Sequence, residues 1–172
     1  MSGLSWLRVL VSSVLVFLVS TIVHAVLKWH DSDYAALSLE QEKAFTSLPE
    51  GTFYSPHKKN SPSHPAWQER CKQEPTVMIR VRSSQGGEHS SMGVHLSLWF
   101  CYVFVISAVT AYAQTLARPT NSSSLCFLVS FVAYWGAEPA KWIWYMVPAS
   151  QAAKNAIDSL LYALVTTLAL SW

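Results

Sequence analysis

One stretch of the chain, residues 96–117, is mostly apolar and contains no charged side chain. A helix of about 20 apolar residues crosses the roughly 30 Å hydrocarbon core of a bilayer, so this run is long enough to span a membrane. The whole chain of 172 residues is 51% hydrophobic and only 13% charged. Soluble domains carry about 25% charged residues. We therefore predict an integral membrane protein that crosses the bilayer several times.

The chain contains three further apolar runs, so we predict four transmembrane helices in all. The first run begins with a short segment containing Arg8 and ends without a cleavage signal, which favours an uncleaved signal-anchor helix. The last two runs are long enough to cross only if they include charged residues, namely Glu138 and Lys141 in one and Lys154 and Asp158 in the other. The predicted spans are 1–27, 93–117, 124–147 and 152–172.

The predicted fold class is thus an all-α membrane protein with one long, mostly irregular extramembrane loop, residues 28–92. The segment 36–48 favours a short amphipathic helix, and 77–82 has the pattern of a strand. The segment 49–56 has the composition of a turn-rich connector. The loop contains too few apolar residues for a core of its own. We expect it to lie on the helix ends or on a partner membrane protein.

The orientation of this loop is left open by the flanking charges. Arg8 and Arg118 favour one side of the membrane, whereas Lys28, Lys141 and Lys154 favour the other. A signal-anchor start with Arg8 retained inside places the loop outside the cytoplasm, and the lysine count places it in the cytoplasm.

The four-span topology gathers the ionisable residues in the leaflet next to the loop. Such residues are costly at membrane depth, so they usually face the bundle interior, pair with one another or line a cavity. Imidazole and carboxylate groups together suit a transition-metal ion such as Zn²⁺, Cu²⁺ or Fe²⁺, and equally a proton relay. The candidate metal ligands are His24, His30, Asp31, Asp33, His95, Glu138 and Asp158.

Structural roles also account for the same residues, and for His24 and Glu138 they are the favoured interpretation. His24 can simply hydrogen-bond between helices, and Glu138 can pair with Lys141 along one helix. On a helix that continues past residue 27, His24, Lys28 and Asp31 share a face. Asp158 can meet Lys154 one turn away. The chain lacks HExxH and CxxC motifs, so its spacing matches no recognised metal site.

Other functions find little support in the sequence. The net charge of +2 and the scattered basic residues argue against nucleic-acid binding. Nucleophile-elbow, P-loop and dinucleotide-binding motifs are absent from the sequence, so we expect no enzymatic activity.

Three segments, HAVLKWHDSDYAALSLEQE (24–42), LPEGTFYSP (48–56) and AEPAKWIWYMVP (137–148), resemble a loose set of small bacterial inner-membrane proteins. Ser38 departs from that pattern, where proline is expected. The resemblance implies a multi-pass protein of the bacterial inner membrane and no particular activity.

Two functions follow as hypotheses. The first is a non-enzymatic accessory or assembly subunit that docks on a partner through residues 28–92. The second is a metal-ion or proton-handling membrane protein that uses the polar residues of the loop-side leaflet.

Overall fold

The computed structural model describes residues 5–56, 65–82, 92–116 and 122–172. The chain divides into two compact units: Met1–Ala35 together with Glu88–Trp172, and Ala36–Gly87. The first unit is helical, which confirms the mainly helical character predicted from the sequence.

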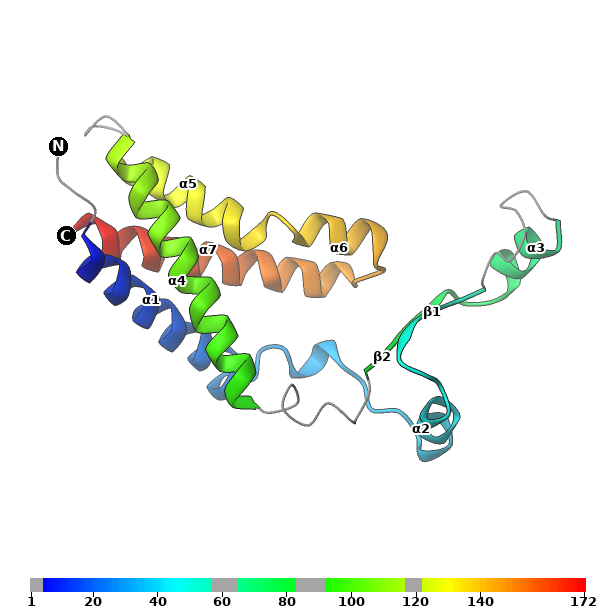
Figure 1. Ribbon diagram of the computed structural model, residues 1–172. Helices are drawn as coiled ribbons and strands as arrows, with labels where there is room; N and C mark the ends of the chain where they lie inside the picture. The colour runs from blue at the N-terminus through cyan, green and yellow to red at the C-terminus, as the bar shows by residue number, and fades with distance from the viewer. Residues whose placement is uncertain (1–4, 57–64, 83–91, 117–121) are drawn as a thin grey trace. The chain divides into compact units, whose positions relative to one another are not determined.

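The first unit is a bundle of long helices in which neighbours along the chain run antiparallel (Figure 1). Its elements are α1 (Trp6–Thr21), α4 (Met92–Leu116), α5 (Ser122–Trp135), α6 (Glu138–Trp144) and α7 (Ala149–Ser171). Helix α1 packs on α4 and α7, and α5 closes the ring by packing on both of these. The start of α1 and the end of α7 meet, because the Arg8 guanidinium lies 5.7 Å from the Trp172 ring centroid.

Small and hydroxyl-bearing side chains fill much of the space between these helices. The Ser12 and Ser107 hydroxyls meet at 3.0 Å where α1 crosses α4, and both residues are fully buried. Ser13 and Ser130 return their hydroxyl groups to carbonyls one turn earlier on their own helices. Small residues at such crossings let helix backbones approach closely, as in membrane bundles.

The third predicted span, 124–147, is not one continuous helix. Helix α5 ends at Trp135 and α6 begins at Glu138, with a turn at Gly136 and Ala137. A Cβ atom on Gly136 would lie 2.6 Å from the Val132 carbonyl oxygen, so only glycine fits there. The break thus comes before Pro139, which takes an early position in α6, where its missing N–H costs nothing.

Two helices of the described residues, Trp6–Val26 and Met92–Leu116, are long and apolar enough to cross a membrane. The prediction of four such spans is therefore met for two only. The break at Gly136 leaves α5 short, and Lys154 and Asp158 make the first half of α7 polar.

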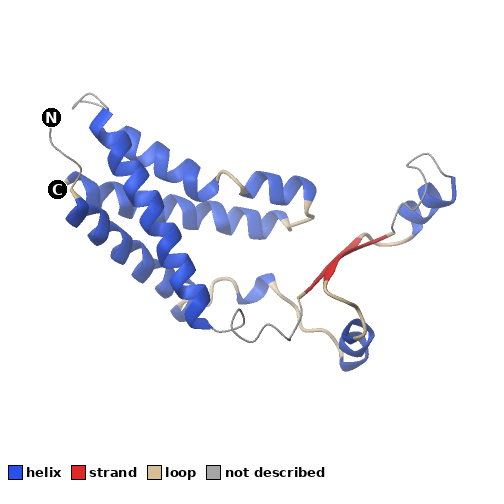
Figure 2. Ribbon diagram, in the orientation of Figure 1, coloured by secondary structure: helices blue, strands red, loops and turns tan. Residues whose placement is uncertain are grey.

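The second unit contains more regular structure than predicted. Strand β1 (Gly51–Ser55) pairs antiparallel with β2 (Val77–Val81), shown in red in Figure 2. The strand predicted at 77–82 is therefore confirmed, whereas the prediction of a turn-rich connector at 49–56 was wrong. Helix α2 (Leu39–Thr46) lies within the predicted 36–48 helix, and α3 (Pro65–Gln73) was missed. The polar composition of α3 hid it, because it contains too few apolar residues to mark out a helical stripe.

Candidate functional site

The candidate site begins where α1 ends and the chain turns back on itself. After Thr21 the helix widens into a single π-helical turn, η1 (Ile22–Val26), and Lys28 takes a left-handed backbone conformation with φ of 51°. Positive φ is uncommon for a residue other than glycine, and π-turns are frequent at functional sites. The reversal places the His30 ring against the His24 ring, with centroids 4.8 Å apart and planes 15° from parallel.

This reversal corrects the expected helical face. His24, Lys28 and Asp31 do not share a face, because the helix has ended before Lys28. Asp31 is exposed, at the start of the short 3₁₀ helix η2 (Asp31–Asp33). Its side chain makes no hydrogen bond or ion pair with any residue that the structure describes.

His30 lies between two carboxylates. Its Nε2 is 2.8 Å from Asp158 Oδ2 on α7, and its Nδ1 is 2.6 Å from Asp33 Oδ2. The Asp33 and Asp158 side chains are 2% and 9% exposed. Since carboxylates only accept, both ring nitrogens donate and the ring is an imidazolium ion. Burial lowers the pKa of His30, but the hydrogen bonds and charges of Asp158 and Asp33 outweigh it and raise that pKa above its ordinary value.

Lys154, one turn before Asp158 on α7, holds the same loop from the other side. Its ammonium donates to Asp33 Oδ1 at 2.6 Å, to the Ser32 hydroxyl at 2.8 Å and to the Trp29 carbonyl at 3.0 Å. The hydrogen bond from Lys154 lowers the pKa of Asp33, against the effect of burial, and the bond from His30 adds to it. Lys154 therefore fastens the loop to α7 and does not bridge to Asp158.

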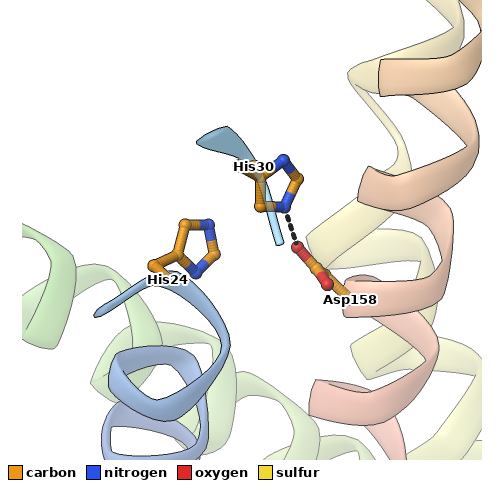
Figure 3. A group of neighbouring side chains, drawn as sticks. All are labelled: His24, His30 and Asp158. Atoms are coloured by element: carbon orange, nitrogen blue, oxygen red, sulfur yellow. Dashed lines mark hydrogen bonds and ion pairs between the residues drawn. The ribbon is translucent and has the colours of Figure 1, made fainter. Parts of the chain in front are cut away.

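His24 completes a group of three possible metal ligands (Figure 3). Its Nδ1 lies 3.0 Å from the Ser20 carbonyl oxygen and must donate to it, so Nε2 carries the free lone pair. One ligand atom from each of His24, His30 and Asp158 lies within 4.8 Å of the others. The histidines come from the end of α1 and from the loop after it, and Asp158 comes from α7.

The two histidines are oriented as metal-binding histidines usually are. In such sites the second ring nitrogen donates to a carboxylate or a backbone carbonyl, which fixes the ring. Asp33 does this for His30, and the Ser20 carbonyl does it for His24.

The spacing of these ligand atoms is that of a hydrogen-bonded group. Ligand atoms about 2.1 Å from a tetrahedral zinc ion are roughly 3.4 Å apart. The contact between His30 and Asp158 is shorter, at 2.8 Å, and the widest separation in the group is longer, at 4.8 Å. The 2.8 Å contact between His30 and Asp158 is the length of a hydrogen bond, in which His30 Nε2–H donates to the carboxylate. A metal ion would replace that proton, lengthen the His30–Asp158 contact to about 3.4 Å and shorten the widest separation to a similar value.

A cavity of about 760 Å³ opens beside this group, among α1, α4, α5, α6 and α7. His24 and Asp158 form part of its wall, and so do Glu138 and His95. Glu138 is buried, with one oxygen 2.6 Å from the Lys141 ammonium and the other 2.7 Å from the Asn155 amide nitrogen.

The structure thus sorts the seven predicted ligands. His24, His30 and Asp158 come together, and Asp33 holds His30 from behind. Glu138 and His95 line the adjoining cavity outside the group of three, and Asp31 lies apart. The part played by Lys154 was missed, because no motif or spacing signals a contact between α7 and a loop more than 100 residues away. The contacts of Asn155 with Glu138 and of the Ser20 carbonyl with His24 were missed as well.

Comparisons with protein-family models, characterised proteins and solved structures found no match. The resemblance to small bacterial inner-membrane proteins stays a prediction.

The His30 contacts predict a pH-dependent stability for the metal-free protein. Because the pKa of His30 is raised on folding, its contribution is complete below about pH 6.5, the ordinary histidine value, and is lost as the pH rises through the folded-state value. The free energy of unfolding should therefore fall on going from mildly acidic to alkaline pH in the presence of a chelator. Denaturant titrations of wild type and His30→Gln would measure this, and an equal slope in both would contradict it.

Proposed function

We propose that this protein is a small integral membrane protein that binds a divalent transition-metal ion through His24, His30 and Asp158. The observation that carries the proposal is the convergence of three ligand atoms within 4.8 Å, with both imidazoles oriented through Nδ1. Three residues from three separate segments would not meet in this way by helical spacing alone.

The chemistry of the donors selects the kind of metal. Two imidazole nitrogens and one carboxylate oxygen suit Zn²⁺, Fe²⁺ or Cu²⁺, whereas Mg²⁺ and Ca²⁺ prefer oxygen donors. Structural zinc sites are usually closed by four protein ligands, and sites with three keep a position open for water or a substrate. With three protein ligands, the fourth coordination position would be open toward the cavity. Such a site suits a metal ion that binds a substrate or that is itself released and replaced.

The distribution of side chains supports placement of the whole bundle in a membrane. Large apolar residues are exposed on the outer faces of all four long helices. They include Leu10 and Leu18 on α1, Leu98 and Val105 on α4, Leu128 and Val132 on α5, and Leu164 and Leu168 on α7. Serine and threonine are buried between the helices. A bilayer accepts this arrangement, and water penalises it. On this proposal, α5 and α6 together form the third membrane span, and α7 forms the fourth.

Cobalt binding tests the proposal. Full-length protein in lipid nanodiscs should bind one Co²⁺ per chain, with the intense visible absorption of a four-coordinate ion, and Zn²⁺ should displace it. His24→Ala should lose this spectrum because only two ligands remain.

His95→Ala is the matched control, because His95 lines the same cavity but lies outside the group of three. It should bind like the wild type. Equal loss of binding in both variants, or no binding by the wild type, would refute the proposed site.

The second candidate is an accessory subunit, favoured by the unit Ala36–Gly87. Neither α2 nor α3 contains a buried residue, and Leu39 and Tyr54 are exposed. A partner that covered these side chains would supply the core that this unit lacks. This candidate requires a stoichiometric partner in native membranes, and a chain recovered from them by itself would contradict it.

A further inference from the structure

The cavity next to the three candidate ligands has the size of a binding site for a small organic molecule. Its volume of about 760 Å³ falls within the roughly 300–1,000 Å³ typical of such sites. Five helices contribute to its wall, so its shape is built into the bundle.

The wall is apolar over most of its area. Leu96, Trp99 and Tyr102 line it from α4, Tyr134 from α5 and Tyr162 from α7. Trp99 is fixed by its indole N–H, which donates to the Ser20 hydroxyl at 2.9 Å. These rings pack edge-on or tilted against one another, with centroids 5.6–6.1 Å apart. A rigid aromatic wall favours the hydrocarbon part of a ligand.

The charged groups of the wall include Glu138, Lys141 and Asp158, and His24 lines the same cavity. With a divalent ion bound and His30 neutral, the neighbourhood of these residues holds four formal positive charges against three negative ones. The positive charges are those of the metal, Lys141 and Lys154, and the negative charges are those of Asp33, Glu138 and Asp158. One surplus positive charge favours an anionic head group on the open coordination position.

We infer that the cavity binds an amphiphilic organic anion of the carboxylate class, with its head group on the metal and its hydrocarbon tail against Trp99, Tyr102 and Tyr162. This inference rests on the proposed metal site. It adds the substrate class: a lipid-like acid, and not a free inorganic anion.

A pair of hydroxamates tests the inference in Co²⁺-loaded protein in nanodiscs. Octanohydroxamate carries a metal-binding anionic head and an alkyl tail, and acetohydroxamate carries the same head and only a methyl group. The change in the Co²⁺ spectrum reports binding at measured free concentrations. Octanohydroxamate should bind at least about tenfold more tightly, because buried methylenes add to affinity.

Two tryptophan variants on α4 separate the cavity from the surrounding lipid. Leu96→Trp narrows the cavity and should abolish the preference for the longer probe. Leu98→Trp, on the outer face at 63% exposed, should keep it. Equal affinity for both probes, or a preference that survives Leu96→Trp, would overturn the inference while the metal site stands. A wild-type protein that takes up no Co²⁺ would overturn the metal site and, with it, this inference.

Discussion

Asp158→Asn is expected to lower the affinity for Zn²⁺ at least about 100-fold while the bundle stays folded. Asp158 supplies the one carboxylate among the three proposed ligands, and a neutral amide oxygen is a much poorer partner for a transition metal. Loss of an outer-sphere partner alone costs about 10–100-fold in metal affinity, so loss of a direct ligand should cost no less. A 100-fold loss corresponds to about 2.7 kcal/mol of binding free energy.

The fold should survive this change because asparagine keeps an oxygen acceptor for the His30 Nε2–H. Zinc affinity would be measured by competition with a chelator, and folding by the denaturant midpoint of the metal-free protein. Asp31→Asn is the control, since it removes the same charge from an exposed carboxylate of the neighbouring loop. If both variants lost affinity equally, overall charge and not ligation would account for the effect.

The gathering of polar residues at one end of the bundle could be predicted because it follows from helix order alone. Each helix that enters or leaves the loop side places its terminal residues in the same layer, so His24 and Asp158 were expected to be neighbours. Their cost at membrane depth gave a second reason to expect pairing. Both arguments depend only on where the apolar runs begin and end.

The partners within that layer could not be predicted, because they depend on local backbone geometry. The left-handed conformation of Lys28 turns the chain and brings His30 back onto His24. A continuous helix would have pointed His30 away. Likewise, the carbonyl of Val132 forces glycine at 136 and ends α5 before Glu138. Neither feature has a composition that distinguishes it from a regular helix end.

The proposed metal site and the observed hydrogen bond both use the side chains of His30 and Asp158, but they require different protonation states of His30. Without metal, His30 is an imidazolium between Asp33 and Asp158, so the buried carboxylates are neutralised from within the chain. With the proposed metal bound, the ion would take over that role and the proton would leave. Asp33 and Lys154 are not among the proposed ligands, so they would be free to hold the loop in both states.

Lys154→Met should therefore release the loop that carries His30. The ammonium makes three contacts with residues 29–33, and its loss leaves Asp33, 2% exposed, with His30 as its remaining cationic partner. Breaking a buried ion pair costs about 3–5 kcal/mol. Because the Lys154 side chain is 20% exposed and His30 still bonds Asp33, we expect a smaller but measurable fall in the free energy of unfolding here. Hydrogen exchange at the Asp31 and Asp33 amides, which close this turn at 3.1 and 2.9 Å, would report the release.

A double-mutant cycle separates the charge pair from general loosening of α7. Asp33→Asn removes the charge that Lys154 neutralises, so Lys154→Met should cost less in that background, with a coupling of about 1–2 kcal/mol. Lys72→Met, which removes a lysine 76% exposed, should leave the free energy of unfolding unchanged. Strictly additive losses for the two substitutions would mean that Lys154 stabilises α7 without holding the loop. His30 lies on that loop, so additive losses would also mean that Lys154 does not help to position His30 in the proposed metal site.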